Sequence, residues 1–262
     1  MSKRQNPPPK ADRKQKTSKK SGRKNKTPAH LAIAGRAKSI LGKGTPFPIV
    51  EEYKLLRSSV SFAAAVGSDA CKIVGLTSPM PSEGKSITCA NLALAFAMTN
   101  ARVLLVDCDL RCPVVASTFR VKSSPGISNL LAGTVPEGVG TIYSVTHNDV
   151  KIDVIASGDI PPNPSELLGS ARAEEIFRML APDYDYIFVD LPPVGMVSDA
   201  VAASKWLSGI VMVIRAGETK RDEVRRSLDR LNIADANVLG FVLNGVPRGG
   251  GGKYSYKYSA YK

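Results

Sequence analysis

The triplet Gly84-Lys85-Ser86 stands where a short apolar run gives way to a long stretch rich in alanine and leucine. A loop between a strand and a helix presents backbone amides, and the positive end of the helix dipole, to a phosphate. Glycine lets the backbone approach that phosphate, lysine reaches its terminal oxygens, and the serine hydroxyl binds Mg²⁺. The strict pattern has a glycine where Pro79 stands here, so the prediction depends on the flanking strand and helix. The loop residues expected to bind ATP are Ser82, Glu83, Gly84, Lys85, Ser86 and Ile87.

Three aspartates follow apolar runs elsewhere in the chain. Asp107 and Asp109 follow the run 104–106, and Asp190 follows the run 187–189. Ligands of open α/β sheets bind at the carboxyl edge of the strands, so we expect these carboxylates to meet a phosphate-bound Mg²⁺. Asp190 is expected to hold the metal directly or through water. Of Asp107 and Asp109, one is the candidate base and the other a second metal contact; the alternative is that one only caps the next element.

The elements that must position these residues alternate between strands and helices. Apolar runs without polar alternation, the pattern of buried strands, occupy residues 73–76, 103–106, 152–155, 187–189, 210–214 and 238–243. Helical patterns occupy residues 49–66, 85–99, 164–180 and 220–231, with Asn163 as the N-cap of the third. This order predicts the α/β class: a P-loop fold with a mostly parallel sheet and helices on both faces.

The positive charge of the chain is concentrated at one end. Residues 1–43 hold 14 Lys and Arg and one acid, while the remaining basic and acidic residues balance. Such a leader suits an anionic membrane surface or another anionic partner; the alternative is a solvated leader that aids solubility. No run approaches the roughly 18 apolar residues of a membrane helix, and no secretory leader is evident. We therefore expect a cytoplasmic protein that reaches a membrane through a partner.

The cysteines and histidines predict no further chemistry. The four cysteines form no CxxC pair, and the two histidines are isolated. Reduced structural thiols are the expected state, and no histidine-based triad or metal site is indicated.

The last ten residues carry a tyrosine cluster behind a run of four glycines. Tyr254, Tyr256, Tyr258 and Tyr261 alternate with lysine and serine, and the glycines uncouple them from the folded part. One interpretation is a phosphate-accepting tail. The alternatives are binding of single-stranded nucleic acid, in which tyrosines stack on bases beside lysines, and an inert tail. Nucleic acid is not the expected partner.

These motifs together resemble a known family, the cytoplasmic bacterial tyrosine kinases (BY-kinases) of the capsule and exopolysaccharide type, the CpsD/CapB group. The likeness covers roughly residues 50–262. It rests on the phosphate loop 82–86, an additional Walker A′ motif at 104–111, a loop at 158–168, a Walker B motif at 187–193 and the terminal tyrosines. It implies an ATP-dependent, Mg²⁺-dependent protein-tyrosine kinase that phosphorylates its own tail and regulates polysaccharide synthesis.

The resemblance also implies roles for single residues. Asp107 would accept the proton of the tyrosine hydroxyl, with Ser86, Asp109 and Asp190 around Mg²⁺ and Lys85 on the phosphates. Asn244 looks like the residue that contacts adenine in related ATPases. Family members build a ring through an E-x₂-R-x₂-R helix, and Glu51, Lys54 and Arg57 have that spacing, with lysine replacing one arginine.

The partners implied are further copies of the chain in a ring, a transmembrane activator of the polysaccharide co-polymerase type and a cognate tyrosine phosphatase. The chain is expected to divide into a disordered basic tail (1–28), a linker (29–49), the kinase domain (50–246) and a hinge with the tyrosine tail (247–262).

The rival reading is a MinD/ParA-like ATPase switch without kinase activity. These division-site and plasmid-partition ATPases share the fold but carry an extra lysine five positions before the P-loop lysine, where Met80 stands here. They also have no reason to end in a tyrosine cluster, so both features favour the kinase.

Overall fold

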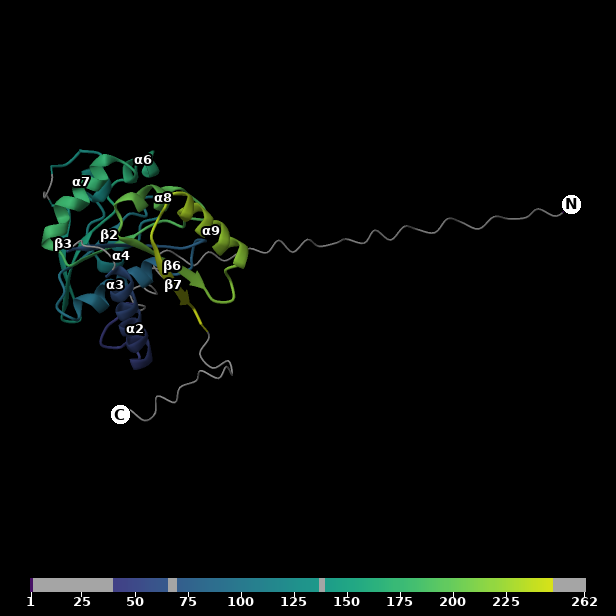
Figure 1. Ribbon diagram of the computed structural model, residues 1–262, viewed down its shortest axis with the longest axis horizontal. Coiled ribbons are helices and arrows are strands. Elements are labelled where there is room, and N and C mark those ends of the chain that lie inside the picture. Colours follow the sequence, from purple (N-terminus) through teal and green to yellow (C-terminus); the bar gives the residue numbers. More distant parts are fainter. Residues whose placement is uncertain (2–39, 66–69, 137–139, 247–262) are drawn as a thin grey trace.

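The computed structural model describes Met1 and residues 40–65, 70–136 and 140–246 (Figure 1). The predicted basic tail, most of the predicted linker and the tyrosine cluster lie outside these ranges. In the part described, no helix is long and apolar enough to cross a membrane.

One seven-stranded sheet, in the order β3-β4-β2-β5-β1-β6-β7, organises the described residues. All neighbouring strands pair in parallel except β3 and β4, which form an antiparallel hairpin. The P-loop class with a mostly parallel sheet is thereby confirmed. The strands are β1 Lys72–Thr77, β2 Val103–Asp107, β3 Ile142–His147, β4 Val150–Ile155, β5 Tyr186–Asp190, β6 Gly209–Arg215 and β7 Val238–Asn244.

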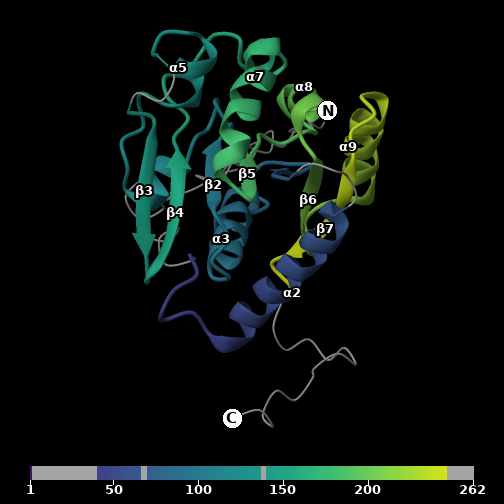
Figure 2. The ribbon, with the colours of Figure 1, turned by 60° about the vertical axis from the view of Figure 1, so that its left-hand side comes forward.

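Helices cover both faces of the sheet, and in Figures 1 and 2 α2 lies on the far side of the molecule from α7 and α8. The longer helices are α2 Phe47–Ala64, α3 Lys85–Ala97, α7 Ala171–Leu180 and α9 Arg221–Ile233. The short ones are α4 Val115–Phe119, α5 Ile127–Leu131, α6 Pro164–Leu168 and α8 Asp199–Ala203, with 3₁₀ turns η1 Ala181–Asp183 and η2 Ser204–Trp206.

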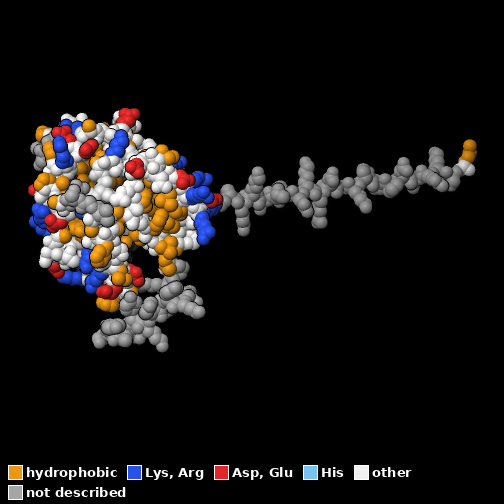
Figure 3. All heavy atoms as spheres, in the orientation of Figure 1, with side chains coloured by type: hydrophobic (Ala, Val, Ile, Leu, Met, Phe, Trp, Pro, Cys, Tyr) orange, Lys and Arg blue, Asp and Glu red, His pale blue; other side chains and the backbone are white. Residues whose placement is uncertain are grey.

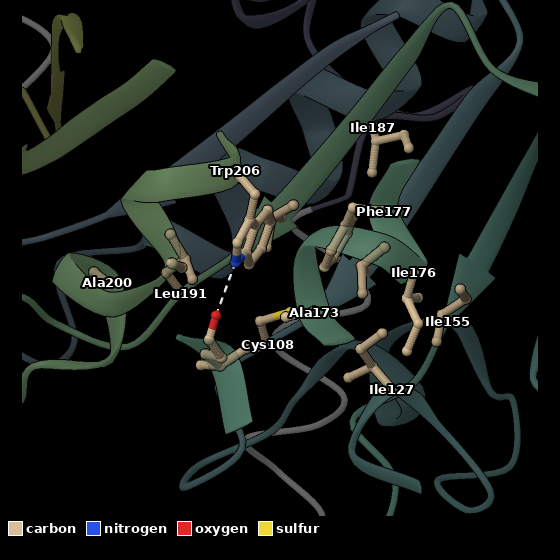
Figure 4. Packing of buried hydrophobic residues seen from close by; sticks show 14 of the residues in the cluster. Cys108, Ile127, Ile155, Ala173, Ile176, Phe177, Ile187, Leu191, Ala200 and Trp206 are labelled. Carbon is tan, nitrogen blue, oxygen red and sulfur yellow. Dashed lines mark hydrogen bonds between the residues drawn. The ribbon is translucent and has the colours of Figure 1, made fainter. Parts of the chain in front are cut away.

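Alternate side chains of the central strands point to opposite faces of the sheet and pack in two separate hydrophobic cores. In β2, Leu104 and Val106 pack on the side of α5, α7 and α8, whereas Val103 and Leu105 pack on the side of α2 and α3. The first core contains a stacked pair, Phe177 and Trp206, whose ring centroids are 4.0 Å apart (Figure 4). Strands buried on both faces explain the absence of polar alternation in the sequence.

The structure departs from the expected elements in three places. The folded unit begins before residue 50, because Ile40 and Leu41 are buried and α2 starts at Phe47. The helix expected over 164–180 is two helices, since the chain breaks after α6 and Ser170 caps α7 by accepting a hydrogen bond from the Ala173 amide. The strand β3 was not expected.

Charged side chains of both signs are interspersed over the face seen in Figure 3. This distribution agrees with a folded part in which basic and acidic residues balance outside residues 1–43.

Candidate active site

The predicted phosphate loop joins β1 to α3, as its chemistry requires. Gly84 precedes the first residue of α3 and has a φ of 91°, a conformation that favours glycine. A Cβ at this position would lie 2.1 Å from Nδ2 of Asn244. Glycine at this position therefore suits both the turn and the close approach of the Asn244 side chain.

Lys85 is the electrostatic centre of the site. Its ammonium nitrogen lies 2.7 Å from Oδ2 of Asp109, 3.2 Å from Oδ1 of Asp190 and 3.1 Å from Oγ of Ser86. The side chain is 10% exposed, and Asp190 is fully buried. Burial lowers the pKa of Lys85, but attraction by Asp190 and Asp109 outweighs it and holds the pKa above its ordinary value. Lys85 is therefore charged and paired in this state.

The three residues predicted to bind Mg²⁺ are thus brought together around one cation. Ser86, Asp109 and Asp190 each place an oxygen on the Lys85 ammonium, and Oδ2 of Asp190 is buried without a hydrogen-bond partner. Within the described ranges, no group of three or more His, Cys, Asp or Glu side chains is spaced to hold a metal alone. Mg²⁺ in nucleotide sites takes phosphate oxygens and water as further ligands, so two carboxylates and a hydroxyl fit it.

Asp107 has a different environment from Asp109. It is the last residue of β2 and fully buried, and its Oδ2 accepts hydrogen bonds from the amides of Val114 and Val115, 3.0 and 2.9 Å away, at the start of α4. Its Oδ1 accepts from the Asp109 amide at 3.2 Å. Burial and then repulsion by Asp190 raise the pKa of Asp107 to about 7. The capping alternative raised by the sequence describes the contacts of Asp107, and its raised pKa also suits a proton acceptor.

Asn244 lies against the phosphate loop. Its Nδ2 donates a 2.8 Å hydrogen bond to the backbone oxygen of Glu83. The buried Glu83 carboxylate in turn accepts from the Met80 amide at 3.0 Å and from the Thr219 hydroxyl. These bonds tie the loop to the ends of β6 and β7. An adenine contact by Asn244 stays a prediction, and no sequence pattern singles out Thr219.

A second ion pair, which the sequence did not indicate, involves the last residue of the Walker A′ motif. Arg111 donates from Nε and Nη2 to the two carboxylate oxygens of Asp199, at 2.9 and 3.1 Å. Asp199 is fully buried at the start of α8, and it also accepts from the Ser165 hydroxyl at the start of α6. The loop 158–168 and the Walker A′ motif, separate in the sequence, thus meet at one carboxylate.

The residues predicted to build the ring lie on α2, and their contacts are within the chain. Lys54 pairs with Glu51 at 2.7 Å, and Nη1 of Arg57 donates to the backbone oxygen of Ala95 at 3.0 Å. Arg57 also lines a cavity of about 260 Å³ with Phe62, Tyr186 and other residues. None of these contacts of Glu51, Lys54 and Arg57 is with the phosphate loop.

Comparisons with known proteins agree with this architecture. A sequence family described as ParA, "NUBPL iron-transfer P-loop NTPase", matches residues 72–246. Tyrosine-protein kinase YwqD of Bacillus subtilis is 34% identical over 79% of this chain and 85% of its own length. Putative tyrosine-protein kinase CapB of Staphylococcus aureus is 33% identical over 80% of this chain and 90% of its own.

Solved structures give the same result. The chimerical protein CapA2B2 superposes with a TM-score of 0.73 and 34% identity over 80% of this chain and 91% of its own. The kinase domain of Escherichia coli tyrosine kinase ETK superposes with a TM-score of 0.71 and 34% identity over 80% of each chain. The septum site-determining protein MinD of Pyrococcus horikoshii gives 0.56 with 22% identity, over 66% of this chain and 70% of its own, which shows the fold alone. The chain belongs to the nucleotide-binding P-loop NTPases and, within them, to the bacterial tyrosine kinases of the capsule and exopolysaccharide type.

Proposed function

We propose that the chain transfers the γ-phosphoryl group of Mg-ATP to the C-terminal tyrosines of another copy of itself and thereby regulates capsule or exopolysaccharide synthesis. The observation that carries the proposal is the convergence of Ser86, Asp109 and Asp190 on the ammonium of Lys85. This arrangement places oxygen ligands and a phosphate-binding lysine at one point beside the helix start. The acceptors are Tyr254, Tyr256, Tyr258 and Tyr261.

Each residue has a role that follows from its contacts. When ATP binds, the loop amides and Lys85 hold the phosphates, and Lys85 exchanges its carboxylate partners for phosphate oxygens. Ser86, Asp109 and Asp190 would hold Mg²⁺, which would neutralise the charge of the phosphates. Asp107 takes the proton of the tyrosine hydroxyl as the tyrosine oxygen bonds to phosphorus and the bond to ADP breaks. Most of the rate enhancement comes from positioning and charge stabilisation.

We place the acceptor in a neighbouring subunit of a ring. Glu51 and Lys54 are paired within α2 and Arg57 is bonded to α3, so ring formation exchanges these contacts for contacts with a second copy. A transmembrane activator of the polysaccharide co-polymerase type would bring the cytoplasmic chain to the membrane and order the site. A cognate phosphatase would reverse the reaction, and the basic leader suits an anionic membrane surface.

Phosphorylation changes the net charge of the tail from positive to negative, and we propose that this change loosens the ring. Its three lysines give +3, and four phosphates of about −1.5 to −2 each make it negative. We expect the phosphorylated full chain to elute from a sizing column as a smaller species than the unphosphorylated chain. Arg57→Ala should give the smaller species without phosphate. Equal sizes before and after phosphorylation would remove this part of the proposal.

Phosphotyrosine mapping tests the central claim. The full chain is incubated with Mg-ATP, with and without the cytosolic segment of a candidate activator, and its tyrosines are mapped by mass spectrometry. We expect phosphate on the tail in the wild type and in Lys205→Ala, a control at an exposed lysine, but not in Lys85→Ala. ATP hydrolysis without phosphotyrosine would instead support the ATPase switch.

A further inference from the structure

Asp199 is a buried carboxylate that the reaction described above does not use. It has no exposed surface, and every polar contact the structure gives its side chain comes from Arg111 or Ser165. A buried carboxylate is costly unless it is paired and hydrogen-bonded, so this one requires its arginine. The two parallel N–H···O bonds fix the plane of the guanidinium as well as its place.

Arg111 lies in the segment between β2 and α4 that also carries Asp109. It lies two residues after Asp109, the nearest carboxylate to Lys85, and the amide of the next residue, Cys112, donates a 3.0 Å hydrogen bond to Oδ1 of Asp109. The Arg111 side chain is 43% exposed, although Asp199 is fully buried. Asp199 occupies Nε and one hydrogen of Nη2, which leaves the Nη1 side of the fork to bind a second anion.

Ser165 connects this pair to the loop 158–168. Its hydroxyl donates to Asp199 and lies 3.1 Å from the hydroxyl of Ser198, which precedes α8. Three segments of the carboxyl edge therefore converge on Asp199: the end of the Walker A′ motif, the start of α6 and the start of α8. A contact of this kind holds Arg111 at one position relative to Asp109.

We propose that Asp199 is a positioning residue of the kinase reaction, which aims the unpaired edge of Arg111 at a phosphoryl group. This proposal rests on the proposed function for the identity of that group. The group is either the γ-phosphoryl of ATP or the phosphate of a phosphotyrosine formed on the tail. Both offer the planar pairs of oxygens that an arginine fork binds, and lysine cannot reproduce the geometry.

The test uses the full chain and four variants: Asp199→Asn, Arg111→Lys, the double variant of these two and the control Asp185→Asn. Asp185 pairs with Arg102 in an ion pair of the same kind, between the residues that directly precede β5 and β2. Calorimetry gives the ratio of Mg-ATP affinity to Mg-ADP affinity. A second titration compares binding of a synthetic peptide of residues 253–262 with and without phosphotyrosine. Phosphotyrosine formation gives kcat and KM, and melting temperatures show whether each variant is folded.

We expect Asp199→Asn and Arg111→Lys to lower kcat by about tenfold to a hundredfold, with Mg-ADP affinity near that of the wild type. If the phosphoryl group belongs to ATP, the ATP-to-ADP affinity ratio falls in both variants; if it belongs to phosphotyrosine, the preference for the phosphorylated peptide falls. The double variant should be no worse than Arg111→Lys alone, because one residue acts through the other.

Unchanged affinity ratios and unchanged peptide preference in folded Asp199→Asn and Arg111→Lys would overturn the proposal. Additive losses in the double variant would also overturn it. A wild-type chain that makes no phosphotyrosine, yet loses its ATP-to-ADP ratio in Arg111→Lys, would leave Asp199 as a positioning residue and refute the kinase function instead. The control Asp185→Asn should match the wild type in every readout.

Discussion

An arginine–aspartate ion pair joins the segments that flank β2 and β5 at each end, and the two pairs differ in burial. At the amino end, Arg102 and Asp185 directly precede the strands and meet at 2.8 Å, with side chains 57% and 43% exposed. At the carboxyl end, Arg111 and Asp199 meet at 2.9 Å, and Asp199 has no exposed surface. The chemical groups are the same, so the difference lies in how much water reaches the carboxylate.

This difference separates a solvated end of the sheet from a preorganised one. Exposed ion pairs are screened and contribute little to stability. At the carboxyl end Lys85 is buried and bonded to the buried Asp109 and Asp190, which are 24 and 105 residues away, and the buried Asp107 is bonded to the start of α4. Charge buried at such a cost is typical of a functional site, where fixed dipoles must be in place before the substrate arrives.

The largest expected effect comes from removing the central cation. Lys85→Ala should reduce phosphotyrosine formation by about 10²- to 10³-fold or more. Because it leaves Asp109 and Asp190 without their partner, it should also lower the free energy of unfolding by about 3 kcal/mol in the absence of metal. Adding Mg²⁺ without nucleotide should raise the melting temperature of this variant more than that of the wild type. Equal responses to Mg²⁺ in scanning calorimetry would contradict the proposed metal position.

A smaller effect is expected from breaking the buried pair. Arg111→Ala leaves the Asp199 carboxylate with only the Ser165 hydroxyl, so the free energy of unfolding should fall by about 1–3 kcal/mol. Urea denaturation with an unchanged slope would measure it. Asp199→Ala should cost less, because the freed Arg111 can be hydrated. If Asp199→Ala were the more damaging of the two, burial would not be what distinguishes the two ends.

Asp107 gives a pH dependence of intermediate size. Its pKa in the folded chain is about 7, above the ordinary value near 3.9 expected after unfolding. The folded state therefore binds this proton more tightly, and the resulting stabilisation is present at low pH and lost as pH rises toward 7. For the metal-free protein, the free energy of unfolding should fall between about pH 4 and 7 less steeply in Asp107→Asn than in the wild type. Parallel curves would show that Asp107 does not titrate in this range.

The smallest effect belongs to the amino end. Arg102→Ala removes an exposed pair whose aspartate has its pKa lowered mainly by the Arg102 side chain, so stability at neutral pH should stay within measurement error of the wild type. Phosphotyrosine formation should also be unchanged. A loss of activity in this folded variant would mean that the amino end contributes to catalysis, and the contrast between the ends would fail.

The local part of the site could be predicted from the sequence. The phosphate loop and the three aspartates follow apolar runs directly, and strands buried on both faces bring their carboxyl ends to one edge. The ion pair with Asp199 could not be predicted, because Arg111 is 88 residues away and an aspartate at a helix start is usually only a cap. The bond from Asn244 to Glu83 spans 161 residues and depends on β7 lying beside the loop.

Two elements differ from the predicted ones for physical reasons. The strand β3 has half-buried and exposed side chains in alternation, since it is the outer strand of a hairpin, and it lacks the continuous apolar run that predicts the buried strands. The helical pattern over 164–180 continues through Gly169 and Ser170 in composition, yet Ser170 caps a new helix there. In both cases the secondary structure depends on packing against other elements, which the local sequence pattern does not show.

The position of Asn244 bears on how phosphorylation should be assayed. This residue touches the phosphate loop of its own chain, and only ten residues separate it from Tyr254. A fully extended segment of that length spans about 35 Å, so contour length alone permits a chain to reach its own nucleotide. Tethering sets a local concentration that dilution cannot change, whereas a neighbour's tail is lost on dilution. The dependence of the phosphorylation rate on protein concentration therefore distinguishes phosphorylation within one chain from phosphorylation between subunits. The length of the segment alone does not distinguish them.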